Sequence, residues 1–161
     1  MKDQKANKVY SLDEAREKIR AYCLYRERSH KEVTDKLYDY GLVELAVGEI
    51  ITQLIQEKYL DEERFARSFV RGKFHQKKWG RQKIRHALYP HKLSDYILRK
   101  AFSEIDDEEY LQVLKVLYEK KEASLKEKNA FVRRSKIANY LIRKGYESDM
   151  VWDLIRSPER Q

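Results

Sequence analysis

Residues that interrupt helices are scarce in this sequence. Five glycines and two prolines among 161 residues are too few for the many turns of an all-β fold. The one cysteine, Cys23, excludes an intramolecular disulfide. No apolar run approaches the length of a membrane span, and residues 1–8 lack the apolar stretch of a signal peptide. We therefore expect a helical, cytoplasmic protein with no membrane contact.

Charge is abundant and unevenly distributed. Charged residues make up 39% of the sequence and hydrophobic residues 42%, which leaves enough apolar side chains for a core and suits a thin, elongated protein. The net charge is +8. Residues 58–100 carry 13 Lys and Arg against 4 Asp and Glu, whereas the segments before and after are close to neutral. This segment predicts a site for phosphate or for an acidic protein surface, although a solvated face has the same composition.

An internal repeat organises the chain. Segments 29–51, 80–102 and 133–155 align without gaps, and their apolar residues share the spacing of two amphipathic helices joined by a turn. The best-matched apolar positions are Val33, Ile84 and Ile137, followed by Leu37, Leu88 and Leu141. Gly41 and Gly145 fall at the turn, where a helix commonly ends in the left-handed conformation. Lys92 replaces them in the middle copy, so we expect that turn to be built differently.

A further helix precedes each helical pair, at about 12–27, 62–77 and 108–128. Ser11 and Asp61 are followed by acidic residues and are expected to cap the first two of these helices. The predicted fold is all-α, with three tandem three-helix repeats that resemble helix-turn-helix units and form an elongated, curved array. The expected repeats cover residues 1–57, 58–106 and 107–161.

The helix at 62–77 separates charge from apolar surface. On a helical wheel of about 100° per residue, Phe65 and Phe69 lie on the face that we expect to pack in the core, and the basic residues lie opposite. Trp79 interrupts the basic stretch that follows, either to stack on a base or anchor an interface, or to fill a gap between helices. The candidate partner-binding and DNA-binding residues are Arg64, Arg67, Arg71, Lys77, Lys78, Trp79, Arg81, Lys83 and Arg85.

No constellation typical of an enzyme is present. The four histidines lack metal-ligand spacing, and neither a glycine-rich phosphate loop nor a nucleophile elbow occurs. The acidic run 106–109 is expected to open a helix. We therefore expect no catalytic residue, metal or cofactor. A stand-alone helix-turn-helix-like nucleic-acid binder remains the alternative to a protein regulator, although the three copies do not share one basic recognition helix.

The central segment resembles a known family. The sequence YLDEERFA at 59–66, then FVR at 69–71, followed by Gly80, Ile84 and Leu88, is similar to the signature of the RecX regulatory proteins. The resemblance covers about residues 12–156. The chain departs from the pattern at Lys83, where Arg is usual, and at Lys92, where Gly is usual.

The resemblance implies a function that the repeat alone does not. It implies a non-enzymatic monomer that lodges in the groove of the RecA–DNA filament and inhibits its ATPase, strand exchange and growth, and so regulates DNA repair and the SOS response. It also implies a weaker affinity for single- and double-stranded DNA.

Overall fold

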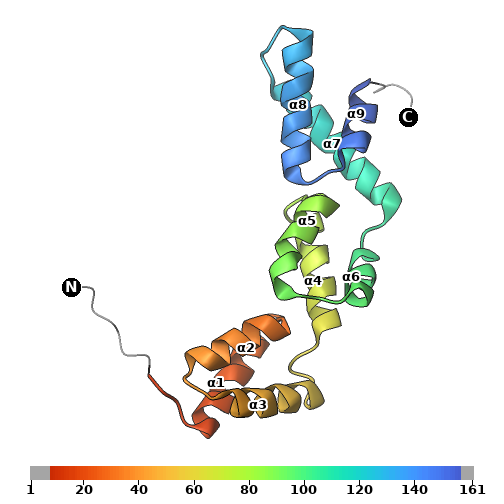
Figure 1. The fold of residues 1–161 in the computed structure, drawn as a ribbon. Coiled ribbons are helices and arrows are strands. Elements are labelled where there is room, and N and C mark those ends of the chain that lie inside the picture. The colour runs from red at the N-terminus through yellow and green to blue at the C-terminus, as the bar shows by residue number, and fades with distance from the viewer. Residues whose placement is uncertain (1–7, 157–161) are drawn as a thin grey trace, which may run out of the picture.

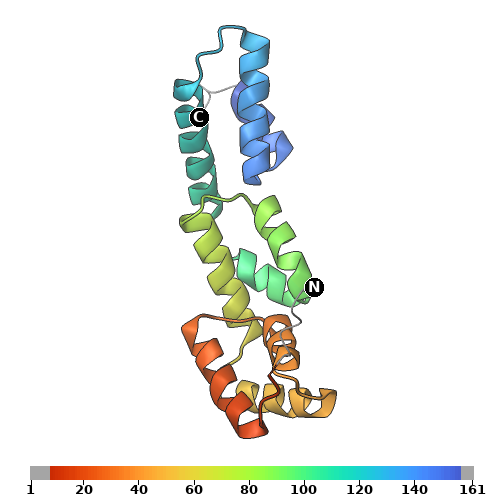
Figure 2. The ribbon, with the colours of Figure 1, turned by 90° about the vertical axis from the view of Figure 1, so that its left-hand side faces the viewer.

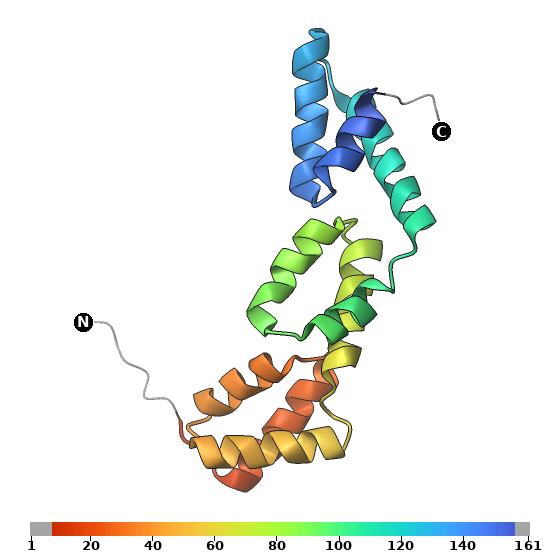
Figure 3. The ribbon, with the colours of Figure 1, turned by 45° about the vertical axis from the view of Figure 1, so that its right-hand side comes forward.

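The computed structural model describes residues 8–156, and the regular structure within that range is entirely helical. Three groups of three helices follow one another along a long axis, in agreement with the predicted all-α helical repeat (Figure 1). The elements are α1 (Leu12–Tyr25), α2 (His30–Asp39), α3 (Glu44–Gln56), α4 (Glu62–His75), α5 (Arg81–Leu88), the 3₁₀ turn η1 (Tyr89–His91), α6 (Asp95–Phe102), α7 (Asp107–Ser124), α8 (Ala130–Lys144) and α9 (Ser148–Arg156). The molecule is elongated in both of the other views (Figures 2 and 3).

Helix boundaries follow the caps and the turns. Ser11 and Asp61 cap α1 and α4 as predicted, each accepting a hydrogen bond from the backbone N–H three residues further on. Helix α7 ends at Ser124, earlier than the predicted residue 128. The Arg133 guanidinium donates to the carbonyl oxygens of Glu122 and Leu125. These bonds hold the chain in a loop where the sequence pattern alone suggested continued helix.

In each group, the turn between the second and third helices contains a residue in the left-handed conformation, although the three turn sequences differ. Gly41 and Gly145 have φ angles of 84° and 107°, the conformation that glycine adopts without steric cost. Lys92 adopts the same region, with φ 53° and ψ 44°, after Pro90 has shaped the 3₁₀ turn η1. The middle turn therefore differs in the residues that lead to it, as expected, but it keeps the left-handed step.

The repeat pattern correctly predicted the core. Val33, Ile84 and Ile137 are at most 3% exposed, and the equivalent leucines are also buried. The predicted core position of Phe65 is confirmed, whereas Phe69 is only half-buried because it lies at the edge of a groove. The buried residues form two clusters, one built by α1–α3 together with Leu60 and another that runs from α4 to α9.

The first joint, between α1–α3 and α4–α6, is polar. Helix α2 meets η1 there, and the Ser29 hydroxyl lies 2.7 Å from Nδ1 of His91. Arg64 Nε donates to a Glu27 carboxylate oxygen at 2.7 Å beside the same boundary. Polar contacts rather than a shared apolar cluster therefore connect the first group of helices to the second.

The second joint, between α4–α6 and α7–α9, is a tight backbone contact. The Gly80 N–H donates to the Lys144 carbonyl oxygen at 2.8 Å, and the Gln82 N–H donates to that of Gly145 at 2.9 Å. A Cβ atom at Gly80 would lie 2.3 Å from the Gly145 carbonyl carbon, so only glycine fits here. Buried Tyr146 donates its hydroxyl hydrogen to the Lys78 carbonyl oxygen across this joint.

Candidate partner-binding surface

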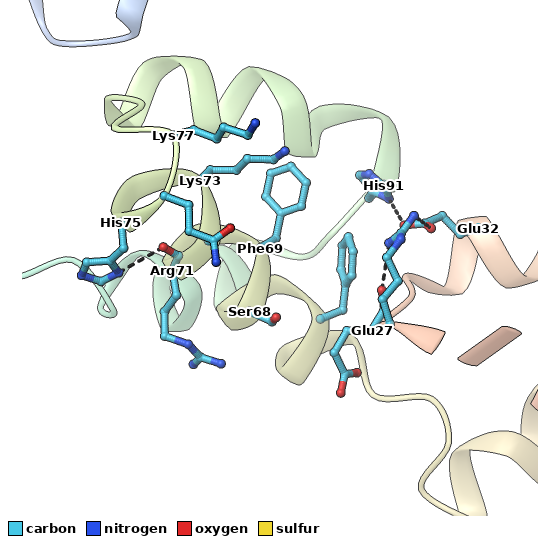
Figure 4. A pocket seen from close by; sticks show the side chains of 13 residues that line it. Glu27, Glu32, Ser68, Phe69, Arg71, Lys73, His75, Lys77 and His91 are labelled. Carbon is cyan, nitrogen blue, oxygen red and sulfur yellow. Dashed lines mark hydrogen bonds and ion pairs between the residues drawn. The ribbon is translucent and has the colours of Figure 1, made fainter. Parts of the chain in front are cut away.

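Helix α4 lines an open groove of about 960 Å³ at the centre of the molecule (Figure 4). Arg26 and Glu27, which follow α1, and Glu32 from α2 form one wall with His91 of η1. The other wall is α4 itself. Lys73 and Lys77 extend alongside the Phe69 ring, while Arg71 and His75 leave the helix on another side. All three of Arg71, Lys73 and Lys77 line the groove, but Lys73, near the end of α4, and Lys77, just beyond that end, have different surroundings from Arg71.

The arginines of α4 are engaged by carboxylates of the same chain. Arg67 Nη1 donates to Glu104 at 2.8 Å, and Arg71 Nη1 lies 3.2 Å from the same carboxylate oxygen. The hydrogen bond from Arg67 holds the pKa of Glu104 below its ordinary value. The helical wheel predicted correctly that these arginines lie opposite Phe65, but it could not predict the carboxylate beside them. The basic face of α4 is therefore partly neutralised within the chain instead of being fully available to a partner.

The contact between Arg67 and Glu104 has an equivalent in the first group of helices. Arg16 of α1 donates from Nε to the Gln53 side chain at 3.2 Å, and both residues lie 51 positions before Arg67 and Glu104. In each group, then, an arginine of the first helix contacts the third helix or the residues that directly follow it. The recurrence indicates a structural role for Arg67, and the repeat offset is the sequence signal that could have revealed it.

Two other candidate arginines are also held by neighbours. Arg64 donates to Glu27 and to the Lys58 carbonyl oxygen. Arg81 pairs with Asp107, and its guanidinium carbon lies 4.0 Å from the Tyr110 ring centroid. Both residues therefore bind parts of the chain that lie beyond α4 and α5.

Two further candidates are Arg85, within α5, and Lys78, which precedes that helix. Arg85 is exposed, with its guanidinium 4.6 Å from the centroid of the Phe102 ring. Lys78 is exposed and left-handed, with φ 58°. Its carbonyl oxygen accepts the Tyr146 hydrogen bond, so its backbone belongs to the second joint while its side chain faces solvent.

Trp79 fills the gap between helices, one of the two roles predicted for it, and its contact with a partner stays a prediction. Its ring is half-buried against the core of α4–α9, which fills the gap between helices. The ammonium nitrogens of Lys73 and Lys83 lie 4.8 and 4.4 Å from its ring centroid. These distances are within the range of a cation–π contact, so the ring also orders two cations at the surface.

Lysines of the central surface differ from the arginines in their partners. Within residues 8–156, the lysines that form ion pairs are Lys31 and Lys136. The central lysines Lys73, Lys77 and Lys83 are outside that group, and their ammonium groups can donate hydrogen bonds to a phosphate or a carboxylate. Sequence reasoning missed Lys73 because it lies beside the apolar stripe, although the row Phe69, Lys73, Lys77 at intervals of four was a visible signal.

Other side chains in the described range lack the features of reaction chemistry. Burial raises the pKa of the Cys23 thiol to about 11, so it stays protonated near neutral pH and is a poor nucleophile. Among residues 8–156, no group of three or more His, Cys, Asp or Glu side chains could hold a metal ion. The same range contains no helix long and apolar enough to cross a membrane.

Comparisons with known proteins point to one family. Residues 61–101 match the model described as RecX, second three-helix domain, and residues 107–155 match RecX, third three-helix domain. The Oceanobacillus iheyensis regulatory protein RecX is 31% identical over 130 residues, covering 81% of this chain and 48% of that protein. The protein of the same name from Clostridium botulinum strain Alaska E43 is 30% identical over 131 residues, covering 80% and 61%.

Solved structures agree with these matches. The crystal structure of RecX from Lactobacillus salivarius superimposes with a TM-score of 0.81 at 25% identity, covering 91% of this chain and 95% of that chain. A second crystal structure of a regulatory protein RecX gives a TM-score of 0.80 at 22% identity and supports the fold alone. The chain spans about half the length of the Bacillus mycoides and Oceanobacillus relatives that it matches, 48% in each case.

Proposed function

The chain belongs to the RecX family of regulatory proteins, and on that premise we propose that it binds the RecA–DNA filament and restrains it. In this proposal the protein is a cytoplasmic monomer without catalytic activity or cofactor. It lowers the ATPase rate of the filament, slows strand exchange and limits filament growth. It binds free single- and double-stranded DNA more weakly than the filament.

The observation that carries the proposal is the central surface of α4 and α5. Lys73, Lys77 and Lys83 cluster around Trp79 and the groove, beside a core that keeps them in place. A lysine ammonium is a compact charge with three donors and can bind either phosphate or carboxylate. A filament of protein and DNA offers both groups.

The proposed contact contains fewer residues than the basic segment 58–100 suggested. We assign the main contact to Lys73, Lys77 and Lys83 with Trp79, flanked by Lys78 and Arg85. The arginines of α4, together with Arg81, hold the helical groups in shape through Glu27, Glu104 and Asp107. We also propose that residues 1–57, 58–106 and 107–161 act as three modules laid along the filament.

An ATPase assay with RecA on single-stranded DNA tests the proposal. Wild-type protein is expected to lower the rate in a saturable way and to hydrolyse no ATP alone. Lys77→Ala combined with Lys83→Ala should raise the concentration needed for half-inhibition at least fivefold, because two cations of the contact are lost. The melting temperature should change little, because Lys77 is exposed and the half-buried Lys83 contributes a cation–π contact of about 1 kcal/mol.

The matched control removes the same charge elsewhere. Lys100 and Lys120 are exposed and lie outside the groove, so replacing both with Ala should leave inhibition within twofold of wild type. An unchanged ATPase rate at saturating wild-type protein would remove the proposal. Equal losses in the two double variants would mean that total charge, and not this surface, determines binding.

A further inference from the structure

The lysine–aromatic arrangement around Trp79 begins on α4. Lys73 Nζ lies between two rings, 5.3 Å from the Phe69 centroid and 4.8 Å from that of Trp79. Lys83, from α5, approaches Trp79 at 4.4 Å. All four side chains are half-buried, so the rings limit the motion of the two ammonium groups.

The arrangement reaches the second joint at Lys83. A Cβ atom on Gly145 would lie 2.4 Å from the Lys83 Cβ, and the Gly80 N–H binds the Lys144 carbonyl oxygen. The backbone of Lys144 is therefore adjacent to the start of α5. The tight glycine contact brings the backbone of Lys144 and Gly145 next to the first turn of α5, where Lys83 lies, although Lys83 and Lys144 are 61 positions apart in sequence.

The same motif recurs beyond the joint. Lys144 Nζ lies 6.0 Å from the ring centroid of Tyr140, and Lys121 Nζ, from α7, lies 4.9 Å from it. Helices α7 and α8 pack together, and these three side chains are also half-buried. A second aromatic ring thus orders a second pair of lysines on the adjoining part of the molecule.

We infer that Lys73, Lys83, Lys144 and Lys121 form one cationic track across the second joint, which binds the phosphodiester backbone of a nucleic acid. The inference rests on the proposed function for its setting and deepens it, because it assigns the nucleic-acid contact to a surface that spans two groups of helices. The carboxyl-terminal part of this surface lies in residues 101–161, whose net charge is zero. Asp and Glu residues elsewhere in that segment balance Lys121 and Lys144, so the net charge alone does not indicate a cationic surface there.

Chemistry favours the backbone over the bases and over a protein carboxylate. Trp79 and Tyr140 each have two lysine ammonium groups near the ring, so the rings support cations instead of offering open faces for base stacking. Arginine is the residue that clamps a planar carboxylate with two parallel bonds. The track contains lysines alone, whose point charges suit phosphates at variable angles, so binding should not depend on base sequence.

Direct binding of DNA without RecA tests the track. The probe is a fluorescently labelled 30-nucleotide oligodeoxythymidylate, and its anisotropy is followed at several salt concentrations. Lys121→Gln with Lys144→Gln keeps much of each side-chain stem over Tyr140 and should weaken binding at least fivefold. The slope of log K against log salt should fall by about 1.4, since each phosphate contact on a single strand contributes about 0.7. A duplex probe of mixed sequence distinguishes single- from double-stranded backbone.

Two further variants make the result specific. Lys126 and Lys128 are exposed in the same group of helices and are not part of the track, so K126Q with K128Q should change affinity less than twofold. K73Q with K83Q, on the other side of the joint, should weaken binding as much as K121Q with K144Q. Unchanged far-ultraviolet circular dichroism verifies that each variant is folded.

The outcomes separate this inference from the proposed function. Equal loss in the control pair, or no loss in K121Q with K144Q, overturns the track. Normal DNA binding by K121Q with K144Q together with weaker inhibition of RecA would assign the surface to an acidic protein partner and also overturns it. If wild-type protein fails to slow the RecA ATPase while the track variants lose DNA binding, the proposed function fails and the track stands.

Discussion

The two joints of this molecule hold neighbouring groups of helices together through different kinds of contact. The second joint has two glycine backbones in contact, and one apolar cluster continues through it from α4 to α9. The first joint has a hydroxyl–imidazole contact and an ion pair, and the apolar cluster of α1–α3 stops short of it. Neighbouring repeats in a solenoid stabilise each other through their interfaces.

The difference has a thermodynamic consequence. Apolar burial and close packing contribute several kcal/mol per interface, whereas a partly exposed ion pair contributes about 1 kcal/mol or less. We therefore expect α4–α9 to behave as one cooperative unit and α1–α3 to open more readily. The proposed lysine track lies entirely on α4–α9, the part of the chain that shares one apolar cluster.

The largest expected effect comes from Gly80→Ala. A Cβ atom there meets the Gly145 carbonyl carbon and oxygen at 2.3 Å, and this neighbour is backbone that cannot move aside cheaply. We expect a loss of about 3 kcal/mol in the free energy of unfolding, at the upper end of overpacking effects, measured by urea denaturation. Gly48→Ala is the control. It lies in α3 with open space around it and should stabilise by about 0.5–1 kcal/mol.

Tyr110→Phe tests the polar contacts buried in the second joint. The Tyr110 hydroxyl accepts a hydrogen bond from the Arg81 N–H at 3.0 Å and donates to Glu147 at 2.7 Å. Losing it removes a partner from two half-buried residues, Arg81 and Glu147, so the free energy of unfolding should fall by about 1–3 kcal/mol in the same assay. Tyr89 is 84% exposed, and Tyr89→Phe should have no measurable effect. A neutral Tyr110→Phe would show that water replaces the hydroxyl.

Alkylation of buried thiols compares the opening of the two cores directly. Cys23 lies in the cluster of α1–α3 and should react with iodoacetamide only when that cluster opens. Moving the thiol to α8, as Cys23→Ala with Ala138→Cys, places it in the larger cluster. We expect Cys23 to react at least tenfold faster under native conditions, which corresponds to about 1.4 kcal/mol. Equal rates would mean that both parts of the chain unfold together.

A smaller effect is expected for the ion pair at the first joint. The side chains of Arg64 and Glu27 are 42% and 32% exposed, so solvent screens their attraction. A double-mutant cycle with Ala at both positions should give a coupling energy of at most about 1 kcal/mol. Salt at 0.5 M should reduce it further. A coupling well above this value would show that the first joint is as strongly built as the second.

The smallest effect concerns pH at the first joint. Burial lowers the pKa of His91, against the opposing influence of the Glu32 carboxylate. The unfolded chain therefore binds a proton at higher pH than the folded chain, and the free energy of unfolding should fall as pH drops through about 6.5. His91→Asn cannot take up that proton and should show a weaker decline between pH 7 and pH 5 in urea titrations. Parallel curves for the two proteins would exclude His91 as the source.

Local and periodic features of the fold were predictable from the sequence. Ser11 and Asp61 cap their helices through bonds that span three residues, and Val33 is buried like its equivalents Ile84 and Ile137. Propensity, capping and apolar period act over short distances along the chain, so the residues themselves contain this information. The basic segment 58–100 was also evident from the sequence. Its composition did not show which cations pair with carboxylates of the same chain and which are available to a partner.

The division between structural arginines and available lysines depended on the tertiary structure. Arg67 meets Glu104 across 37 residues, and Lys83 meets the backbone of Gly145 across 62. Such encounters depend on how whole helices cross, and small changes in a joint would alter them without changing the helical pattern. Sequence by itself determined where the helices lie along the chain and most of the positions that they bury, although α7 ends before residue 128 and Phe69 is only half-buried. The tertiary structure decided which charges are neutralised within the chain, because Coulomb interactions depend on distances that only the packed helices establish.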